Sequence, residues 1–81
     1  MANSKNVPVG TTPTPISTAQ AIRSVYNSGT INVYLGYGDN LSLTNYLVEL
    51  VPNAYFEEPV EVTNYLYAIA SGSTSVQVGE F

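Results

Sequence analysis

One stretch of the sequence decides the expected fold: Ile31-Asn32-Val33-Tyr34-Leu35-Gly36-Tyr37-Gly38. Successive side chains of a β-strand point to opposite sides. Every second residue from Ile31 to Tyr37 would therefore lie on one face, and each of these is apolar or aromatic. Turn-forming residues stand on both sides, in Asn27-Ser28-Gly29 and Gly38-Asp39-Asn40. The pattern predicts a core strand over residues 31–37.

The preceding segment, residues 16–26, fits two secondary structures. Ser17 and Thr18 could cap a short helix, because good helix formers follow them. Against this, apolar and polar residues alternate up to Tyr26, and a short turn then leads directly into the strand at 31–37. We favour a strand that pairs with residues 31–37 as a hairpin.

The rest of the chain favours more short strands separated by turns. They are expected at residues 41–51 (two short strands), 54–56, 60–62, 64–70 and 75–80. Residues 64–70 are apolar on both faces, which predicts a central strand that is buried on both sides or shared with a partner chain. The number and spacing of these segments predict an all-β fold, either a small β-sandwich or a partly open barrel, jelly-roll-like in character.

Residues 1–15 are expected to form an extended N-terminal arm, separate from a β domain at residues 16–81. Three prolines, Pro8, Pro13 and Pro15, disfavour both a helix and a central strand there. A disordered terminus and an arm ordered on a neighbouring subunit are both compatible with this composition. In the second case the partner-binding residues would be Val7, Val9 and Ile16.

The composition excludes several classes of protein. Lys5 and Arg23 are the two cations, against six acidic residues, so the chain lacks the cations that phosphate neutralisation requires. Nucleic acid and anionic membrane surfaces are therefore not expected partners, and no apolar run reaches the ~20 residues of a spanning helix. The core of an 81-residue chain is small, and without Cys or His it has no disulfide or zinc site to support it. We therefore expect a homo-oligomer.

The residues also argue against catalysis. A nucleophile needs a base within hydrogen-bond reach, and the chain has no His, no Cys and a single Lys. Glu57, Glu58 and Glu61 could in principle carry out acid–base chemistry or bind a hard cation, but their spacing favours a solvated loop. We expect no enzyme, no cofactor and no metal.

Two further groups of side chains are candidates for partner contacts. Arg23 would need solvent or a subunit interface if residues 16–26 form a strand. The seven tyrosines can pack in the sheets, stack on sugars or form protein interfaces. Among them, Tyr65 and Tyr67 belong to the doubly apolar segment and are predicted to bind a partner.

Several phrases of the sequence, spread from about residue 18 to residue 81, resemble small virion proteins of tailed bacteriophages. They are Gln20-Ala21-Ile22-Arg23-Ser24-Val25-Tyr26-Asn27, Asn32-Val33-Tyr34-Leu35-Gly36, Leu50-Val51-Pro52-Asn53-Ala54, Tyr65-Leu66-Tyr67-Ala68-Ile69 and Val76-Gln77-Val78-Gly79-Glu80. Where those proteins have a glycine after the proline of a turn, this chain has Asn53, which also tolerates a positive φ.

The resemblance implies a β-sandwich that decorates or cements a capsid. The expected partners are the major capsid protein and further copies of the chain, with a trimer as the expected oligomer. The expected location is the capsid surface of the virion, after synthesis in the host cytoplasm, since no apolar segment suited to a cleavable export signal follows Lys5. The alternative is a receptor- or glycan-binding domain at a phage fibre or tail tip.

Overall fold

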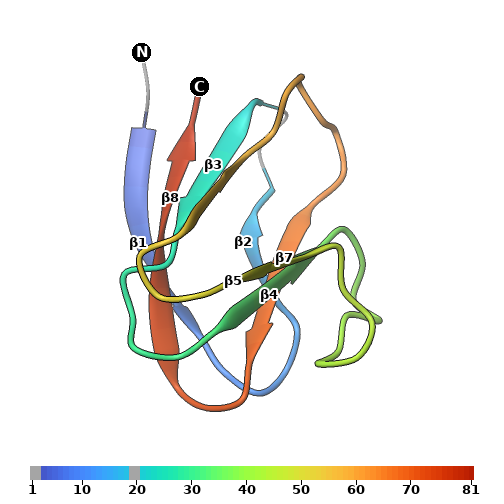
Figure 1. Ribbon diagram of the computed structural model, residues 1–81. Coiled ribbons are helices and arrows are strands. Elements are labelled where there is room, and N and C mark those ends of the chain that lie inside the picture. Colours follow the sequence, from blue (N-terminus) through green and yellow to red (C-terminus); the bar gives the residue numbers. More distant parts are fainter. Residues whose placement is uncertain (1–2, 19–20) are drawn as a thin grey trace.

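The computed structural model describes residues 3–18 and 21–81. They form eight strands in two antiparallel sheets, joined by turns and loops (Figure 1). One sheet has the strand order β1-β8-β3-β6 and the other β2-β7-β4-β5. These residues contain no helix, and so no helix that could cross a membrane. The strands are β1 (Asn3–Val9), β2 (Thr14–Ser17), β3 (Arg23–Tyr26), β4 (Val33–Gly36), β5 (Val48–Leu50), β6 (Tyr55–Glu57), β7 (Leu66–Ala70) and β8 (Thr74–Glu80).

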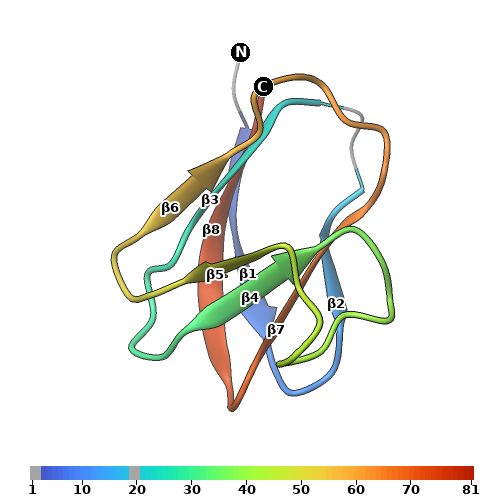
Figure 2. The same cartoon turned by 45° about the vertical axis from the view of Figure 1, so that its right-hand side comes forward.

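The two sheets face each other as in a β-sandwich and do not close into a barrel (Figure 2). Their facing sides form one hydrophobic core, to which both sheets contribute. In β8, Val76 and Val78 are fully buried while Gln77 between them is exposed, which is the alternation that the sequence predicted. The prediction of an all-β fold is confirmed.

The segment that is apolar on both faces forms a central strand, as predicted. β7 pairs with β2 on one side and β4 on the other. Ala68 is buried in the core, and Ile69, on the opposite face, is only 5% exposed. This single chain therefore already buries most of β7 on both sides.

The predicted hairpin between residues 16–26 and 31–37 is wrong. The first segment is divided between β2 and β3, which lie in different sheets, and β3 pairs with β8 and β6 rather than with β4. Asn27 explains the crossing, because its buried side chain donates to the carbonyls of Ile31 (2.9 Å) and Leu50 (2.8 Å) and accepts from the amide of Gly29 (3.0 Å). These bonds direct the chain into the second sheet. Ala19 and Gln20 of the predicted strand lie outside the described residues.

The expected N-terminal arm is not confirmed. β1 pairs with β8 along its whole length, from Asn3 opposite Glu80 to Val9 opposite Thr74, and β2 pairs with β7. Both are edge strands, so each has one pairing neighbour. Proline is tolerated at an edge because one side of the strand makes no ladder hydrogen bonds, and this accommodates Pro8 and Pro15. Met1 and Ala2 of the expected arm lie outside the described residues.

The turn between β5 and β6 agrees with its predicted conformation. Asn53 has φ of 71°, in the left-handed region that Asn adopts more readily than most residues. Its amide donates to the carbonyl of Asn27 at 2.9 Å, which joins this turn to the crossing between β3 and β4. Of the two strands expected in residues 41–51, the structure contains one, β5, preceded by an ordered loop.

Candidate functional site

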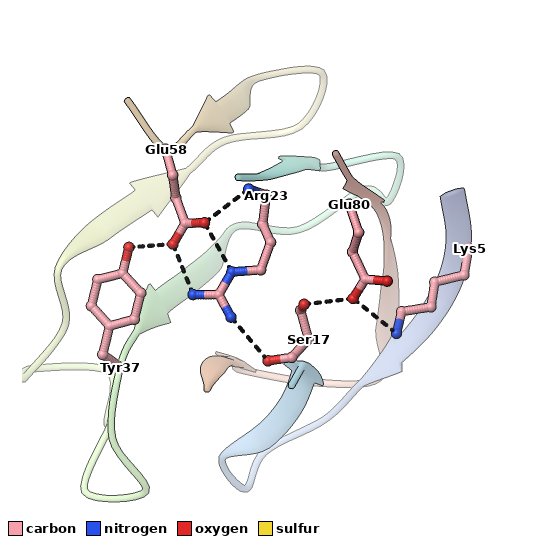
Figure 3. Close-up of polar contacts among 6 residues, drawn as sticks. All are labelled: Lys5, Ser17, Arg23, Tyr37, Glu58 and Glu80. Carbon is pink, nitrogen blue, oxygen red and sulfur yellow. Dashed lines mark hydrogen bonds and ion pairs between the residues drawn. The ribbon is translucent and has the colours of Figure 1, made fainter. Parts of the chain in front are cut away.

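A buried ion pair lies between the sheets at the end where β3 begins (Figure 3). The side chains of Arg23 and Glu58 are both fully inaccessible to solvent. Oε1 of Glu58 accepts from Nε (2.8 Å) and from the backbone amide (2.9 Å) of Arg23, and Oε2 accepts from an η-nitrogen at 2.9 Å. The Tyr37 hydroxyl donates to Oε2 at 2.5 Å, and the Tyr37 ring lies 5.9 Å from the guanidinium carbon. The carboxylate is thus held by four donors.

These contacts fix the charge states of the three groups. Burial alone would raise the pKa of the Glu58 carboxyl, but the hydrogen bonds from Arg23 and Tyr37 and the adjacent positive charge lower that pKa below its ordinary value. The hydrogen bond to Glu58 raises the pKa of Arg23 against the opposing effect of burial. Burial and the neighbouring carboxylate raise the pKa of Tyr37 to about 12. At neutral pH the site is an ionised pair with a neutral phenol.

A second polar group continues this layer toward the edge of the sandwich. Arg23 also donates to the carbonyl of Ser17 at 3.4 Å, and the Ser17 hydroxyl donates to Glu80 at 2.6 Å. Lys5 forms an ion pair with the same carboxylate at 3.5 Å (Figure 3). Each of these two cations is paired with a carboxylate, Arg23 in the buried interior and Lys5 at the half-exposed edge.

The hydrogen bonds around Glu58 leave this carboxylate poorly suited to proton transfer. A carboxylate that accepts four hydrogen bonds and has a lowered pKa is a poor general base. Among residues 3–18 and 21–81, no group of three metal-ligating side chains is present, and no buried side-chain polar atom lacks a partner. The network joins β3, the segment after β4 and the segment after β6 into one rigid unit.

Two expectations for these residues were wrong. Arg23 does not lie on an exposed or intersubunit face, because the single chain buries it completely. Glu58 is not part of a solvated loop, since it is 1% exposed, whereas its neighbour Glu57 is exposed as expected. The sequence gives no local signal for the pair, because the partners are 35 positions apart and meet only when β3 and β6 align.

The other predicted partner-binding residues have diverse environments. Val9 and Ile16 are buried in the core of the domain, and Val7 packs against that core. A partner could contact Val9 and Ile16 only if β1 and β2 were exchanged between subunits, whereas Val7 is partly exposed. Tyr67 is half-buried in β7, whereas Tyr65 is 51% exposed. Of these six residues, Tyr65 exposes the largest fraction of its surface.

A loop that exposes apolar side chains follows β4. We call residues 41–47 the apolar loop; it is the light green segment that projects beside β4 in Figures 1 and 2. Leu43, Tyr46 and Leu47 are 43%, 42% and 58% exposed. Sequence reasoning missed them because the apolar alternation around Leu43 is also the pattern of a core strand.

Several contacts hold the apolar loop in place. The backbone groups of Ser42 and Asn45 bond each other in both directions, at 3.0 and 3.3 Å. The Leu47 amide donates to the carbonyl of Leu35 at 2.8 Å, and the rings of Tyr46 and Tyr34 are centred 4.8 Å apart. Its exposed apolar side chains are therefore presented by an ordered backbone.

Comparison of the sequence with protein-family models and with curated proteins finds no match, and comparison of the fold with solved structures finds none either.

Proposed function

We propose that this protein is a non-catalytic structural module, a decoration or cement protein that binds the major capsid protein and stabilises the head of a virion. The observation that carries the proposal is the apolar loop, residues 41–47. Three large apolar side chains are exposed there on a backbone that is held by its own hydrogen bonds. A surface that is already ordered loses little conformational entropy on binding, so such a loop is suited to protein docking.

The strand order supports the virion context. The orders β1-β8-β3-β6 and β2-β7-β4-β5 arise because consecutive strands repeatedly cross between the two sheets. We interpret this order as an eight-stranded jelly roll, an architecture found in viral capsid domains as well as in lectins and cupins. Fold alone does not define function, and the strand order supports the virion context by analogy, in agreement with the sequence resemblance.

The proposed assembly is a closed homo-oligomer, a trimer, on the outside of the shell. Exposed apolar side chains elsewhere on the chain, Val51 among them at 51% exposure, provide candidate self-contacts. Sedimentation of the purified protein would measure the oligomer. A folded monomer at all concentrations would contradict this part of the proposal.

The main experiment tests attachment to the shell. Purified protein is mixed with heads that lack it, and occupancy is measured by mass spectrometry of the washed particles. Leu43 and Leu47 are 43% and 58% exposed, so together they can bury about one leucine side chain on docking. Replacing both by serine therefore removes roughly 1.5–3 kcal/mol, which corresponds to about a tenfold to hundredfold loss of affinity. Val60→Ser, an equally exposed apolar residue outside the loop, is the matched control. Full occupancy by the double variant, or absence of this chain from purified virions, would refute the proposal.

A further inference from the structure

The outer face of the β1-β8-β3-β6 sheet contains a hollow of about 270 Å³. Its floor is made of small residues on three adjacent strands, because Ser4 of β1 and Ser24 of β3 are both aligned with Gly79 of β8. The aromatic residues Tyr26, Tyr55 and Phe81 also line it. They are 40%, 68% and 60% exposed, although the core of so small a domain would gain from burying them.

Gly79 keeps the floor of this hollow low. A Cβ atom at this position would lie 2.8 Å from the Ser24 hydroxyl oxygen and 3.2 Å from the Phe81 ring, so any other residue would displace one of them. The glycine thus allows the Phe81 ring to lie close to the strand.

One aromatic side chain of the hollow is held by a hydrogen bond, and backbone contacts fix where the other two leave the sheet. The Tyr26 hydroxyl donates to Oδ1 of Asn53 at 3.0 Å, and Asn53 itself stands in the ordered turn before β6. The Phe81 amide donates to the carbonyl of Ile22 at 2.9 Å. Tyr55 is the cross-strand neighbour of Tyr26, so its position follows from the pairing of β3 with β6. The hollow is therefore preorganised, which lowers the entropic cost of binding a ligand.

The chemistry of the lining defines the ligand. None of the described residues that line the hollow has a charged side chain, and its polar side-chain groups are the hydroxyls of Ser4, Ser24, Tyr26 and Tyr55 and the amide of Gln77. Hydroxyls and amides both donate and accept hydrogen bonds, as sugar hydroxyls do, whereas a proline-rich peptide offers only acceptors at its prolines. The net charge of −4 and the engagement of Arg23 and Lys5 by carboxylates disfavour an anionic ligand.

We propose that this hollow, which we call the aromatic hollow, binds a neutral carbohydrate. The faces of Tyr55, Tyr26 and Phe81 stack against the apolar side of a sugar ring, while Ser24 and Gln77 bond its hydroxyls. The site is on the opposite sheet from β4, which leads into the apolar loop, so this inference does not rest on the capsid proposal. It adds a ligand-binding activity to a structural module.

The test begins with the complete protein on an array of neutral hexose and N-acetylhexosamine oligosaccharides. The best oligosaccharide is then titrated into ¹⁵N-labelled protein, and we expect the amide signals of Ser24, Gln77 and Gly79 to shift. Tyr55→Ala removes the most exposed ring of the hollow and should weaken binding about tenfold or more. Tyr65→Ala, an exposed tyrosine that does not line the hollow, is the matched control and should bind normally.

A second variant tests the shape of the hollow without removing an aromatic ring. Gly79→Ala keeps all three aromatic residues but raises the floor, and it should also weaken binding. The inference is overturned if no neutral oligosaccharide binds, if only anionic glycans or proline-rich peptides bind, or if Tyr55→Ala and Tyr65→Ala behave alike. Occupancy of virion heads by Tyr55→Ala should remain complete, so loss of sugar binding and loss of capsid attachment are distinguishable.

Discussion

Replacing Glu58 by glutamine should destabilise this protein severely. The substitution preserves size and shape but removes the negative charge that faces the buried guanidinium of Arg23. It also places an NH₂ group where Arg23 or Tyr37 now donates a hydrogen bond to the carboxylate. The result is a buried cation that has lost its facing carboxylate, with at least one donor directed at another donor.

The size of the effect follows from the complete burial of the pair. Breaking a buried ion pair by removing one partner costs roughly 3–5 kcal/mol. At about 0.05–0.15 kcal/mol per residue, an 81-residue chain has a total stability of roughly 4–12 kcal/mol. The melting temperature of a domain of this size falls by about 4–8 °C per kcal/mol, so we expect a decrease of roughly 12–40 °C.

Urea denaturation and thermal melts followed by circular dichroism would measure this loss. Glu57→Gln, at the exposed neighbouring position, should change stability by less than about 0.5 kcal/mol. The double variant Arg23→Met, Glu58→Met removes both charges and should recover most of the stability, because hydrophobic replacement of a whole buried pair is often neutral or stabilising. A Glu58→Gln variant within about 1 kcal/mol of the wild type would refute the reasoning.

Two further predictions follow from the same structure. In the unfolded chain Glu58 becomes protonated near its ordinary pKa of 4.5, whereas the folded chain keeps it ionised to lower pH, so the ion pair stabilises the fold fully above pH 4.5 and this contribution disappears as pH falls through the lower folded pKa. The urea midpoint should therefore fall less steeply below pH 4.5 in Glu58→Gln than in Glu57→Gln. Equal slopes would contradict this. Deleting residues 1–9 removes β1 with Val7 and Val9 and should destabilise the domain by roughly 3 kcal/mol or more in urea denaturation; unchanged stability would favour the separate arm instead.

The sequence by itself determined several of the strands and the alternation of their side chains between core and solvent. Alternation in residues 31–37 and 75–80, and the doubly apolar residues 64–70, predicted strands that the structure contains within one or two residues as β4, β8 and β7. The positive φ at Asn53 could also be predicted from the sequence, because it depends on the residue and its immediate neighbours. These are local properties, and local sequence encodes them.

Only the tertiary structure decided which strands are neighbours and what each outer face presents. β3 and β4 separate into different sheets because Asn27 bonds carbonyls from Ile31 and Leu50, the second of which is 23 positions away. Arg23 is buried because Glu58 arrives from a distant strand, and alone it would have to remain in solvent. The aromatic hollow likewise requires β1, β8, β3 and β6 to lie side by side. Pairing between distant segments depends on the free energy of the whole fold, and no single stretch of the chain specifies it.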